Sequence, residues 1–428
     1  MIVRRALQFS TLAVVAAACT DLTALEQQNP GQLGAATLYV PGNAQLLVNG
    51  AIADFECAFS RYVIGTGLFT DELSVAIGAV SNFNYDRRTV LPTEAYGNAT
   101  CGSNQQPPIY TTLSVARASA DTVLAKLEGW TDAQMAAGVN RTRLIAQSSA
   151  YAGWSLLLLG ESMCTAAINL SPAMTPAQLF DEARLRFDKA VTAANTASDA
   201  ATLNFAYLGR ARALLNLKTA ASTTAAAADA ARIPAGFVAN ISTDGVNVRR
   251  QNFAFLTINQ NSWNTVEASF RNLTINGIPD PRVAVTDARR AGTATGSTMW
   301  TPDKYPALTT VMPIARWAAA QYIIAEARVA AGDLSGAADA INAVRATRTG
   351  LGTYSATGQS AAQVLTQIVE ERRRELFLEG YRLGDMRRLN LPLLPATGTA
   401  YAIGGGSYGD QSCFPLPDAE RINNPNIG

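Results

Sequence analysis

Helix-forming segments that follow one another in pairs limit the fold of this chain more than any other feature. Apolar side chains recur at helical spacing in these segments, and none of them keeps the alternating pattern of a half-buried strand. The segments span residues 110–127, 141–163, 176–194, 203–217, 314–331, 334–346 and 361–379. Only Gly332 and Asp333 separate two of them, which suits a tight turn between antiparallel helices. The pattern therefore predicts a mainly α protein built from helix pairs.

Small residues inside these pairs indicate how the helices pack. Alanine recurs along residues 318–346, and residues 203–231 repeat the layout with a looser turn. Short side chains let two antiparallel helices approach closely, and this layout resembles a tetratricopeptide unit. Each such unit buries its apolar face against a neighbour, so several units should stack. We therefore expect a tetratricopeptide-like helical-repeat scaffold that carries long irregular loops.

Other parts of the chain lack helical periodicity. Residues 31–107 and 391–428 are mixed in composition, and residues 233–305 are rich in Asn, Thr, Gly and Pro. We expect one mature domain, residues 19–428, whose helical-repeat core carries a loop-rich insertion at about 233–305. Long loops that persist in a compact domain usually carry its function.

The first residues have the layout of an export signal. Arg4 and Arg5 precede an apolar run at residues 12–18, which is too short to span a bilayer as a helix. Small residues directly before Cys19 resemble the lipobox of bacterial lipoproteins, although Ala16 stands where leucine is usual. We expect residues 1–18 to be a signal peptide and Cys19 to carry the lipid that anchors the protein; secretion without a lipid is the alternative.

Cysteine numbers indicate disulfides in the exported protein. Excluding Cys19 leaves four of the five cysteines, an even set in an oxidising compartment. We favour Cys57 with Cys101, because both lie in the mixed N-terminal part, and Cys164 with Cys413 by elimination. Buried free thiols are the alternative. A zinc site is disfavoured because no CxxC spacing occurs.

The absence of histidine excludes several kinds of chemistry. The chain contains no histidine, which rules out histidine-dependent catalytic triads and histidine-ligated metal sites. Lys and Arg number 34 against 33 Asp and Glu, and loss of Arg4 and Arg5 with the leader leaves 32 against 33. A nearly neutral chain lacks the general positive field that nucleic-acid binding requires. We expect no nucleic acid, no cofactor and no bound metal.

Charged residues concentrate in one C-terminal run, which we call the C-terminal signature. Glu371 and Glu375 stand four residues apart on one helix face, and Gly380 suits a left-handed helix cap. Arg382, Asp385 and Arg388 then supply charges that should pair with those carboxylates. The signature comprises Glu371, Arg372, Glu375, Glu379, Gly380, Arg382, Asp385 and Arg388. The pattern by itself indicates a structural ion network.

This signature resembles the C-terminal region of the SusD/RagB family of outer-membrane nutrient-uptake lipoproteins. Agreement extends to Asp21, Leu22 and Pro30 after the leader, to the helix pairs at 314–327 and 340–345, and to the segments 414–417 and 424–426. The resemblance implies a helical-repeat lipoprotein at the cell surface. Such a protein captures a glycan or another nutrient and closes as a lid over a SusC-like TonB-dependent transporter barrel.

Loop aromatics are the candidate ligand contacts. A sugar presents a flat apolar face ringed by hydroxyls, so its site needs an exposed ring with polar groups beside it. The candidates are Trp263, Trp300, Tyr305, Tyr85 and Tyr96, and a core position is the alternative for each. Trp154 and Trp317 fall on predicted helices, and we expect them in the core.

Adjacent carboxylates raise the question of glycosidase activity. A glycosidase needs two carboxyl groups facing each other across a cleft, at about 5 Å in retaining enzymes. Asp71 and Glu72 are direct neighbours, as are Glu370 and Glu371, and ion pairing explains them better. We therefore predict a nutrient-binding protein without enzymatic activity, most simply for an oligosaccharide. The rival hypothesis is an envelope scaffold that binds a protein partner and no small ligand.

Overall fold

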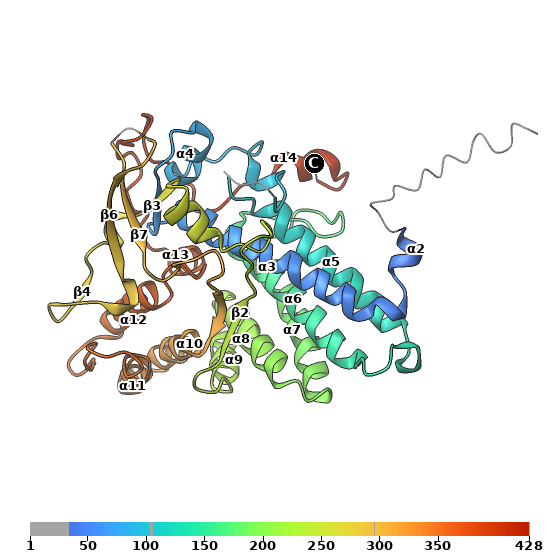
Figure 1. Ribbon diagram of the computed structural model, residues 1–428. Helices are drawn as coiled ribbons and strands as arrows, with labels where there is room; N and C mark the ends of the chain where they lie inside the picture. The colour runs from blue at the N-terminus through green and yellow to red at the C-terminus, as the bar shows by residue number, and fades with distance from the viewer. Residues whose placement is uncertain (1–33, 103–105, 295, 428) are drawn as a thin grey trace, which may run out of the picture.

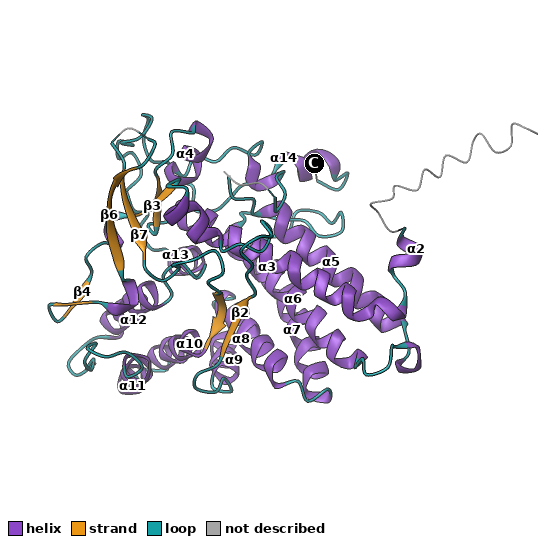
Figure 2. Cartoon of the chain, viewed as in Figure 1, coloured by secondary structure: helices purple, strands orange, loops and turns teal. Residues whose placement is uncertain are grey.

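A computed structural model describes residues 34–102, 106–294 and 296–427 of the chain (Figure 1). The expected signal peptide and Cys19 lie outside these residues. Helices dominate the described part, and short strands gather at one side of the molecule (Figure 2). The predicted mainly α class is confirmed.

A stack of antiparallel helices forms the body of the protein. Each helix packs on the next, from α3 to α12, as in a helical-repeat array (Figure 1). The members are α3 (Ala44–Phe69), α5 (Tyr110–Gly129), α6 (Arg141–Ser162), α7 (Pro176–Thr196), α8 (Ala200–Asn216), α9 (Ala220–Ala230), α10 (Trp317–Ala330), α11 (Leu334–Arg345) and α12 (Ala361–Glu375). The shorter helices are α2 (Ala35–Leu38), α4 (Val80–Arg87), α13 (Arg382–Leu389) and α14 (Asp418–Asn423).

Local sequence fixes where several of these helices begin. Side chains at the N-cap accept a hydrogen bond from a first-turn N–H, which satisfies a donor that the helix itself leaves free. The capping residues are Asn140, Thr175, Asp199, Thr219, Asp333 and Ser360. Thr175 and Ser360 also form capping boxes with Gln178 and Gln363. The predicted starts at 176, 334 and 361 therefore agree with the structure.

The longest helix, α3, was not expected from the sequence. Its 26 residues lie in a stretch that we predicted to be mixed, and Cys57 belongs to this helix, not to a loop. From Phe55 onward the side chains of α3 are buried on all sides. A helix buried all round has no polar face, so its sequence lacks the periodicity that identifies surface helices.

The strands form four separate antiparallel pairs. They are β1 (Leu73–Val75) with β3 (Asn264–Val266), β2 (Val238–Ile241) with β8 (Met312–Arg316), β4 (Thr274–Ile275) with β5 (Ile278–Pro279), and β6 (Val285–Ala291) with β7 (Thr298–Pro302). Most of these strands belong to the stretch 233–305, and the π-helical segment η4 (Phe255–Gln260) lies between them. Residues 312–316 form β8, so the helix predicted to start at 314 begins at Trp317 instead.

Two disulfides close the chain on itself. Cys57 of α3 is bonded to Cys101, and Cys164, just after α6, is bonded to Cys413 in the C-terminal tail. This is the pairing that the sequence favours. The second bond joins residues 249 positions apart and holds the tail against the end of α6.

Small residues bring α6, α7 and α8 together around aromatic rings. Gly153 and Gly209 both contact the ring of Phe187, and Trp154 stacks on Phe205 at a centroid distance of 5.1 Å. A methyl group at Gly209 would lie 2.4 Å from Phe187, which is closer than carbon atoms can approach. The absence of a side chain at this position is therefore needed for helix packing.

The charged residues of the C-terminal signature are buried, and each forms at least one ion pair. Glu371 accepts from Arg282 and Arg345, and Glu379 accepts from Arg316 at 2.8 Å and from Lys304. Glu375 pairs with Arg316 and Arg348. These cations lie outside the signature, in the insertion, in β8, in α11 and in the turn after α11. Our expectation that Arg382, Asp385 and Arg388 would pair with Glu371 and Glu375 is therefore wrong.

The arginines of the signature pair instead with carboxylates that follow α3, lie on α10 or belong to the signature itself. Arg382 donates to both oxygens of Asp71, at 2.6 and 2.9 Å, just after α3. Asp385 accepts from Arg372 at 2.8 Å and from Arg388 at 2.9 Å, and Arg388 also pairs with Glu326 of α10. Burial alone would raise the pKa of Asp385, but these two arginines lower it to about 2.

The turn between α12 and α13 also differs from the prediction. The helix predicted over 361–379 ends at Glu375, and Gly380 follows it with a positive φ of 72°. Gly380 therefore has the left-handed conformation that we expected, but it leads into α13 and does not cap α12. Its carbonyl oxygen accepts a hydrogen bond from Arg212 of α8 at 2.7 Å.

A substitution at Gly209 tests the close packing of α6, α7 and α8. We expect Gly209→Ala to lower the free energy of unfolding by roughly 1–3 kcal/mol, because the new methyl group overlaps Phe187. Gly129→Ala is the matched control, since nothing lies within 4 Å of a methyl group at the end of α5. Chemical denaturation of both variants measures the difference. Equal stability of the two would contradict the packing argument.

A second test concerns the buried carboxyl of Glu72. Burial raises its pKa from 4.5 to about 7; its Oε1 accepts from the Leu378 N–H at 2.8 Å, while Oε2 has no partner among the described residues. Between these two pH values the folded protein holds a proton that the unfolded chain releases. The contribution of Glu72 to stability therefore falls as pH rises from 4.5 to about 7, and then stays constant.

We expect Glu72→Gln to remove the loss of stability that Glu72 causes as pH rises, because an amide does not titrate. Relative to the native protein, the variant should gain up to roughly 3 kcal/mol of stability between pH 5 and pH 8. Thermal and urea unfolding at both pH values provide the measurement. Glu128→Gln, which changes an exposed carboxylate, is the control and should show no such gain. An equal response of both variants would show that the Glu72 carboxyl is not the source of the pH dependence.

Candidate ligand-binding site

Three of the predicted ligand contacts are core residues. Tyr85, Tyr96 and Tyr305 are 0%, 0% and 1% exposed. Each hydroxyl donates to a distant main-chain carbonyl, at Pro107, Pro415 and Leu378. A buried tyrosine whose hydroxyl finds such a partner ties loops together. Their rings present no surface to a ligand, so the expectation is corrected for these three positions.

Trp263 and Trp300 lie in or next to two neighbouring strands, β3 and β7. Trp263 directly precedes β3, and Trp300 is part of β7. Thr265 of β3 accepts a hydrogen bond from the Trp300 N–H at 2.8 Å, so the two strands are neighbours (Figure 1). Both tryptophans are half-buried. The structure therefore places the two tryptophans on adjacent backbone segments.

The two rings differ in what already covers them. Trp300 packs against the main hydrophobic core, and the Arg271 guanidinium lies 5.3 Å from its ring centroid. Trp263 is held through its backbone: its N–H donates to Thr257 and its carbonyl accepts from Ala76 at 2.7 Å. Among the described residues, Trp300 is thus packed against the main core cluster, whereas Trp263 does not belong to that cluster.

Of the two helix tryptophans, Trp154 occupies the core as expected, whereas Trp317 lies at its edge. Trp154 is fully buried, and its indole N–H donates to the Phe205 carbonyl at 3.2 Å. Trp317 is half-buried and packs against two hydrophobic clusters.

Neither adjacent carboxylate pair forms an acid pair across a cleft. Asp71 is bound by Arg382, whereas Glu72 is buried beside Leu378. Glu371 lies between two arginines, and Glu370 pairs with Arg374 at 2.6 Å. Ion pairing therefore explains Asp71, Glu370 and Glu371, as predicted, but not Glu72, whose carboxyl is bound by a main-chain N–H and forms no ion pair among the described residues.

A polar cleft that sequence reasoning missed lies beside Tyr354. Its volume is about 400 Å³, which is large enough for a sugar unit. Hydroxyl, amide and charged groups line it together with one aromatic ring. The lining residues are Thr274, Ile275, Asn276, Arg282, Arg345, Thr353, Tyr354, Ser355, Gln367, Glu370, Glu371 and Arg374.

Tyr354 is held firmly at the edge of this cleft. Asn342 of α11 binds both its N–H and its carbonyl, at 2.7 and 2.8 Å, and the tyrosine hydroxyl donates to Gln359 at 2.6 Å. Gly350, Gly352 and Gly358 flank it with positive φ angles. The sequence signal that could have indicated this cleft is an aromatic residue between closely spaced glycines after a helix. Such a loop is unlike the turns between the other helices.

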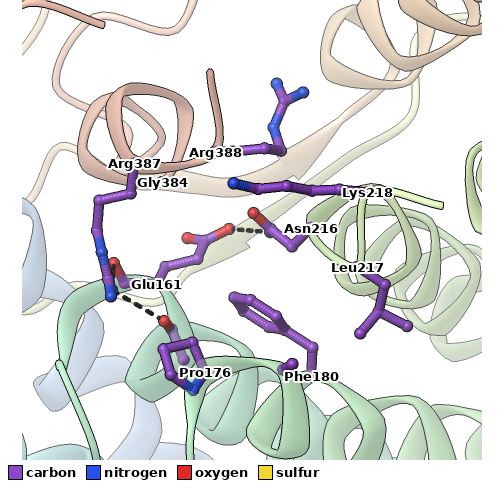
Figure 3. Close-up of a pocket in the computed structure, with 11 residues that line it drawn as sticks. Glu161, Pro176, Phe180, Asn216, Leu217, Lys218, Gly384, Arg387 and Arg388 are labelled. Atoms are coloured by element: carbon purple, nitrogen blue, oxygen red, sulfur yellow. Dashed lines mark hydrogen bonds between the residues drawn. The ribbon is translucent and has the colours of Figure 1, made fainter. Parts of the chain in front are cut away.

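A second recess lies between the ends of helices (Figure 3). It encloses about 310 Å³ and is formed by the C-terminal ends of α6 and α8, the start of α7, and α13. Its walls are Gly160, Glu161, Pro176, Ala177, Phe180, Asn216, Leu217, Lys218, Gly384, Arg387 and Arg388. This recess combines an apolar wall at Phe180 and Leu217 with several cations.

Metal-ligand clusters and membrane-spanning helices are both absent from the described part of the chain. There, no cluster of three or more Cys, Asp or Glu side chains is arranged to hold a metal ion. Among the same residues, no helix has both the length and the apolar character needed to cross a bilayer.

Comparison with known proteins agrees with the resemblance inferred from the C-terminal signature. The model of the SusD family matches residues 293–427, which include the whole signature. No curated protein matches the chain. A SusD superfamily protein from Bacteroides fragilis has a TM-score of 0.69 and 16% sequence identity, over 91% of this chain and 99% of that one.

Glycan-binding proteins are also among the similar structures. Surface glycan-binding protein A from Bacteroides thetaiotaomicron has a TM-score of 0.68 and 14% identity, over 89% of this chain and 96% of that one. The same protein in complex with laminarihexaose gives a TM-score of 0.67 and 15% identity, over 90% and 98%. The chain is thus similar to the SusD family in sequence over residues 293–427, and it has the fold of SusD-like proteins over about nine-tenths of its length.

Proposed function

We propose that this chain is a surface-exposed outer-membrane lipoprotein that binds an oligosaccharide and delivers it to a SusC-like TonB-dependent transporter. The observation that carries the proposal is the SusD-like fold, which extends over about nine-tenths of the chain and ends in the matched C-terminal region. One protein of this fold holds laminarihexaose. Capture is non-covalent and needs no catalytic group.

Trp263 is the proposed stacking platform. A sugar ring places its C–H face on an aromatic ring, and nearby amides and charged groups bind its hydroxyls. Trp263 is half-buried, with Asn259 and Asn261 close in sequence and Trp300 on the neighbouring strand. The cleft at Tyr354 offers the same chemistry at a second position, with Asn276 and Gln367 as amides.

The charge balance of the Tyr354 cleft suits a neutral ligand. Arg282 and Arg345 are paired with Glu371, and Arg374 is paired with Glu370 and Asp280. A wall whose charges already cancel binds hydroxyl groups through hydrogen bonds and gives no net attraction to an ion. Neutral glycans are therefore the first class to test.

A binding measurement tests the ligand. We expect the chain starting after Cys19 to bind laminarihexaose or another member of a panel of neutral plant, algal and bacterial glycans in calorimetry. Trp263→Ala should weaken that binding about tenfold or more, because the stacking contact is lost, which corresponds to ~1.4 kcal/mol. Tyr354→Ala, measured in parallel, assigns the ligand to one position or the other.

The control is Trp130→Ala. Trp130 is also half-buried, but it packs on the separate cluster around Val48 and Leu127 at the end of α5. This variant should bind like the native protein. If no glycan of the panel binds, the oligosaccharide proposal is wrong. Co-purification with a protein other than an outer-membrane barrel would then favour the partner-binding scaffold.

A fractionation experiment tests the anchor. We expect the full-length protein to sediment with outer membranes and to be accessible to protease added to whole cells. Cys19→Ser should release it into a soluble fraction, because diacylation of Cys19 would be lost and with it about 0.8 kcal/mol for each buried methylene group. The Cys413→Ser variant retains Cys19 and should stay with the membrane. Membrane association of Cys19→Ser would contradict a lipid anchor.

A further inference from the structure

The recess of Figure 3 contains two cations without carboxylate partners. Arg387, on α13, donates from Nη1 to the main-chain oxygens of Gly160 and Glu161, at 3.0 and 2.6 Å. No carboxylate among the described residues forms an ion pair with it. Burial lowers the pKa of Arg387, and the nearby Glu161 charge opposes this only in part. The guanidinium is thus fixed in place and its charge is not neutralised.

Lys218 supplies the second charge. It follows α8 in the left-handed conformation, with a φ of 60°, and lines the recess. Figure 3 shows its side chain extending across the recess toward Arg388 and Gly384. Within the described chain Lys218 has no ion-pair partner, and it is exposed. A ligand that enters the recess therefore meets an ammonium group.

The other charges of the recess cancel one another. Glu161 accepts from Arg212 Nε at 2.7 Å and from Asn216 at 2.9 Å, so its carboxylate is satisfied. Arg388 is bound by Glu326 and Asp385. These pairs leave the charges of Lys218 and Arg387 in excess. An anion placed between them would gain from both without having to displace an existing ion pair.

We propose that this recess is a binding site for an anionic group, a carboxylate, sulfate or phosphate, carried on a small ligand. A volume of about 310 Å³ accommodates one sugar-sized unit. Phe180 and Leu217 supply an apolar wall beside the two cations. The site is separate from Trp263 and Tyr354, and it does not depend on the proposed capture of neutral glycans.

Calorimetry with matched probes tests this site. Glucuronate carries a carboxylate on a sugar ring, glucose is its neutral counterpart, and inorganic sulfate is an anion without a ring. We expect glucuronate or sulfate to bind, glucose not to bind, and the affinity to fall as salt is raised. Binding of both anions indicates a site for the charge alone, whereas binding of glucuronate only indicates recognition of an acidic sugar.

Two variants locate the binding. Lys218→Gln should weaken anion binding about fivefold or more, while laminarihexaose binding, where present, stays unchanged. Arg387→Gln should do the same, and Arg387→Lys, which keeps the charge, should restore part of the affinity. Lys126→Gln is the control, because Lys126 is an exposed lysine on α5, near Tyr39. Thermal unfolding establishes that each variant is folded.

Three results would overturn the proposal. One is the absence of binding by glucuronate and by sulfate up to about 20 mM, which is beyond any useful affinity. Another is equal binding of glucose and glucuronate. The third is an anion affinity that Lys218→Gln leaves unchanged in a folded protein.

Discussion

The buried ion network around α12 and α13 is the constraint on which the rest of this structure depends. Transferring an arginine or a carboxylate out of water costs several kcal/mol, and only a complete set of partners offsets that cost. Here the partners come from separate parts of the chain: Asp71 after α3, Arg282 in the insertion, Arg316 in β8 and Glu326 in α10. All of these partners must be in place for the charges to be paired. The network therefore fixes how the strands of the insertion pack on the helical stack.

The same network forms one side of each recess. Glu371, with its arginine partners, forms one side of the cleft at Tyr354, and Arg388 forms one side of the recess in Figure 3. A wall made of fully paired charges is rigid, because each side chain is held from two directions. The position of either recess therefore depends on the C-terminal signature, although few residues of that signature are accessible to a ligand.

Sequence predicted those structural features whose determining contacts lie within a few residues along the chain, and it failed where the contacts come from distant residues. The helix starts at Pro176, Leu334 and Ala361 follow from caps within three residues, and these predictions agree with the structure. Helix α3 escaped prediction because burial on all sides removes the periodic signal. Tyr85, Tyr96 and Tyr305 were misassigned because their partners are main-chain carbonyls distant in sequence. The prediction that the carboxylates of the signature form ion pairs is confirmed, but their partners could not be predicted. Residue spacing identifies partners within one helix, and it does not identify a partner that lies on another helix or strand.

Charge balance separates what the two recesses can bind. In the Tyr354 cleft every arginine has an acidic partner, so selectivity rests on hydrogen-bond geometry and ring stacking, which suit neutral hydroxyl-rich ligands. In the recess at α13, the carboxylate of Glu161 is already bound by Arg212, and the main-chain contacts of Arg387 leave its charge intact. Electrostatic attraction in a partly enclosed space then favours an anion over a neutral sugar of equal size. One fold thus offers a neutral and a cationic recess, both built against the same buried network.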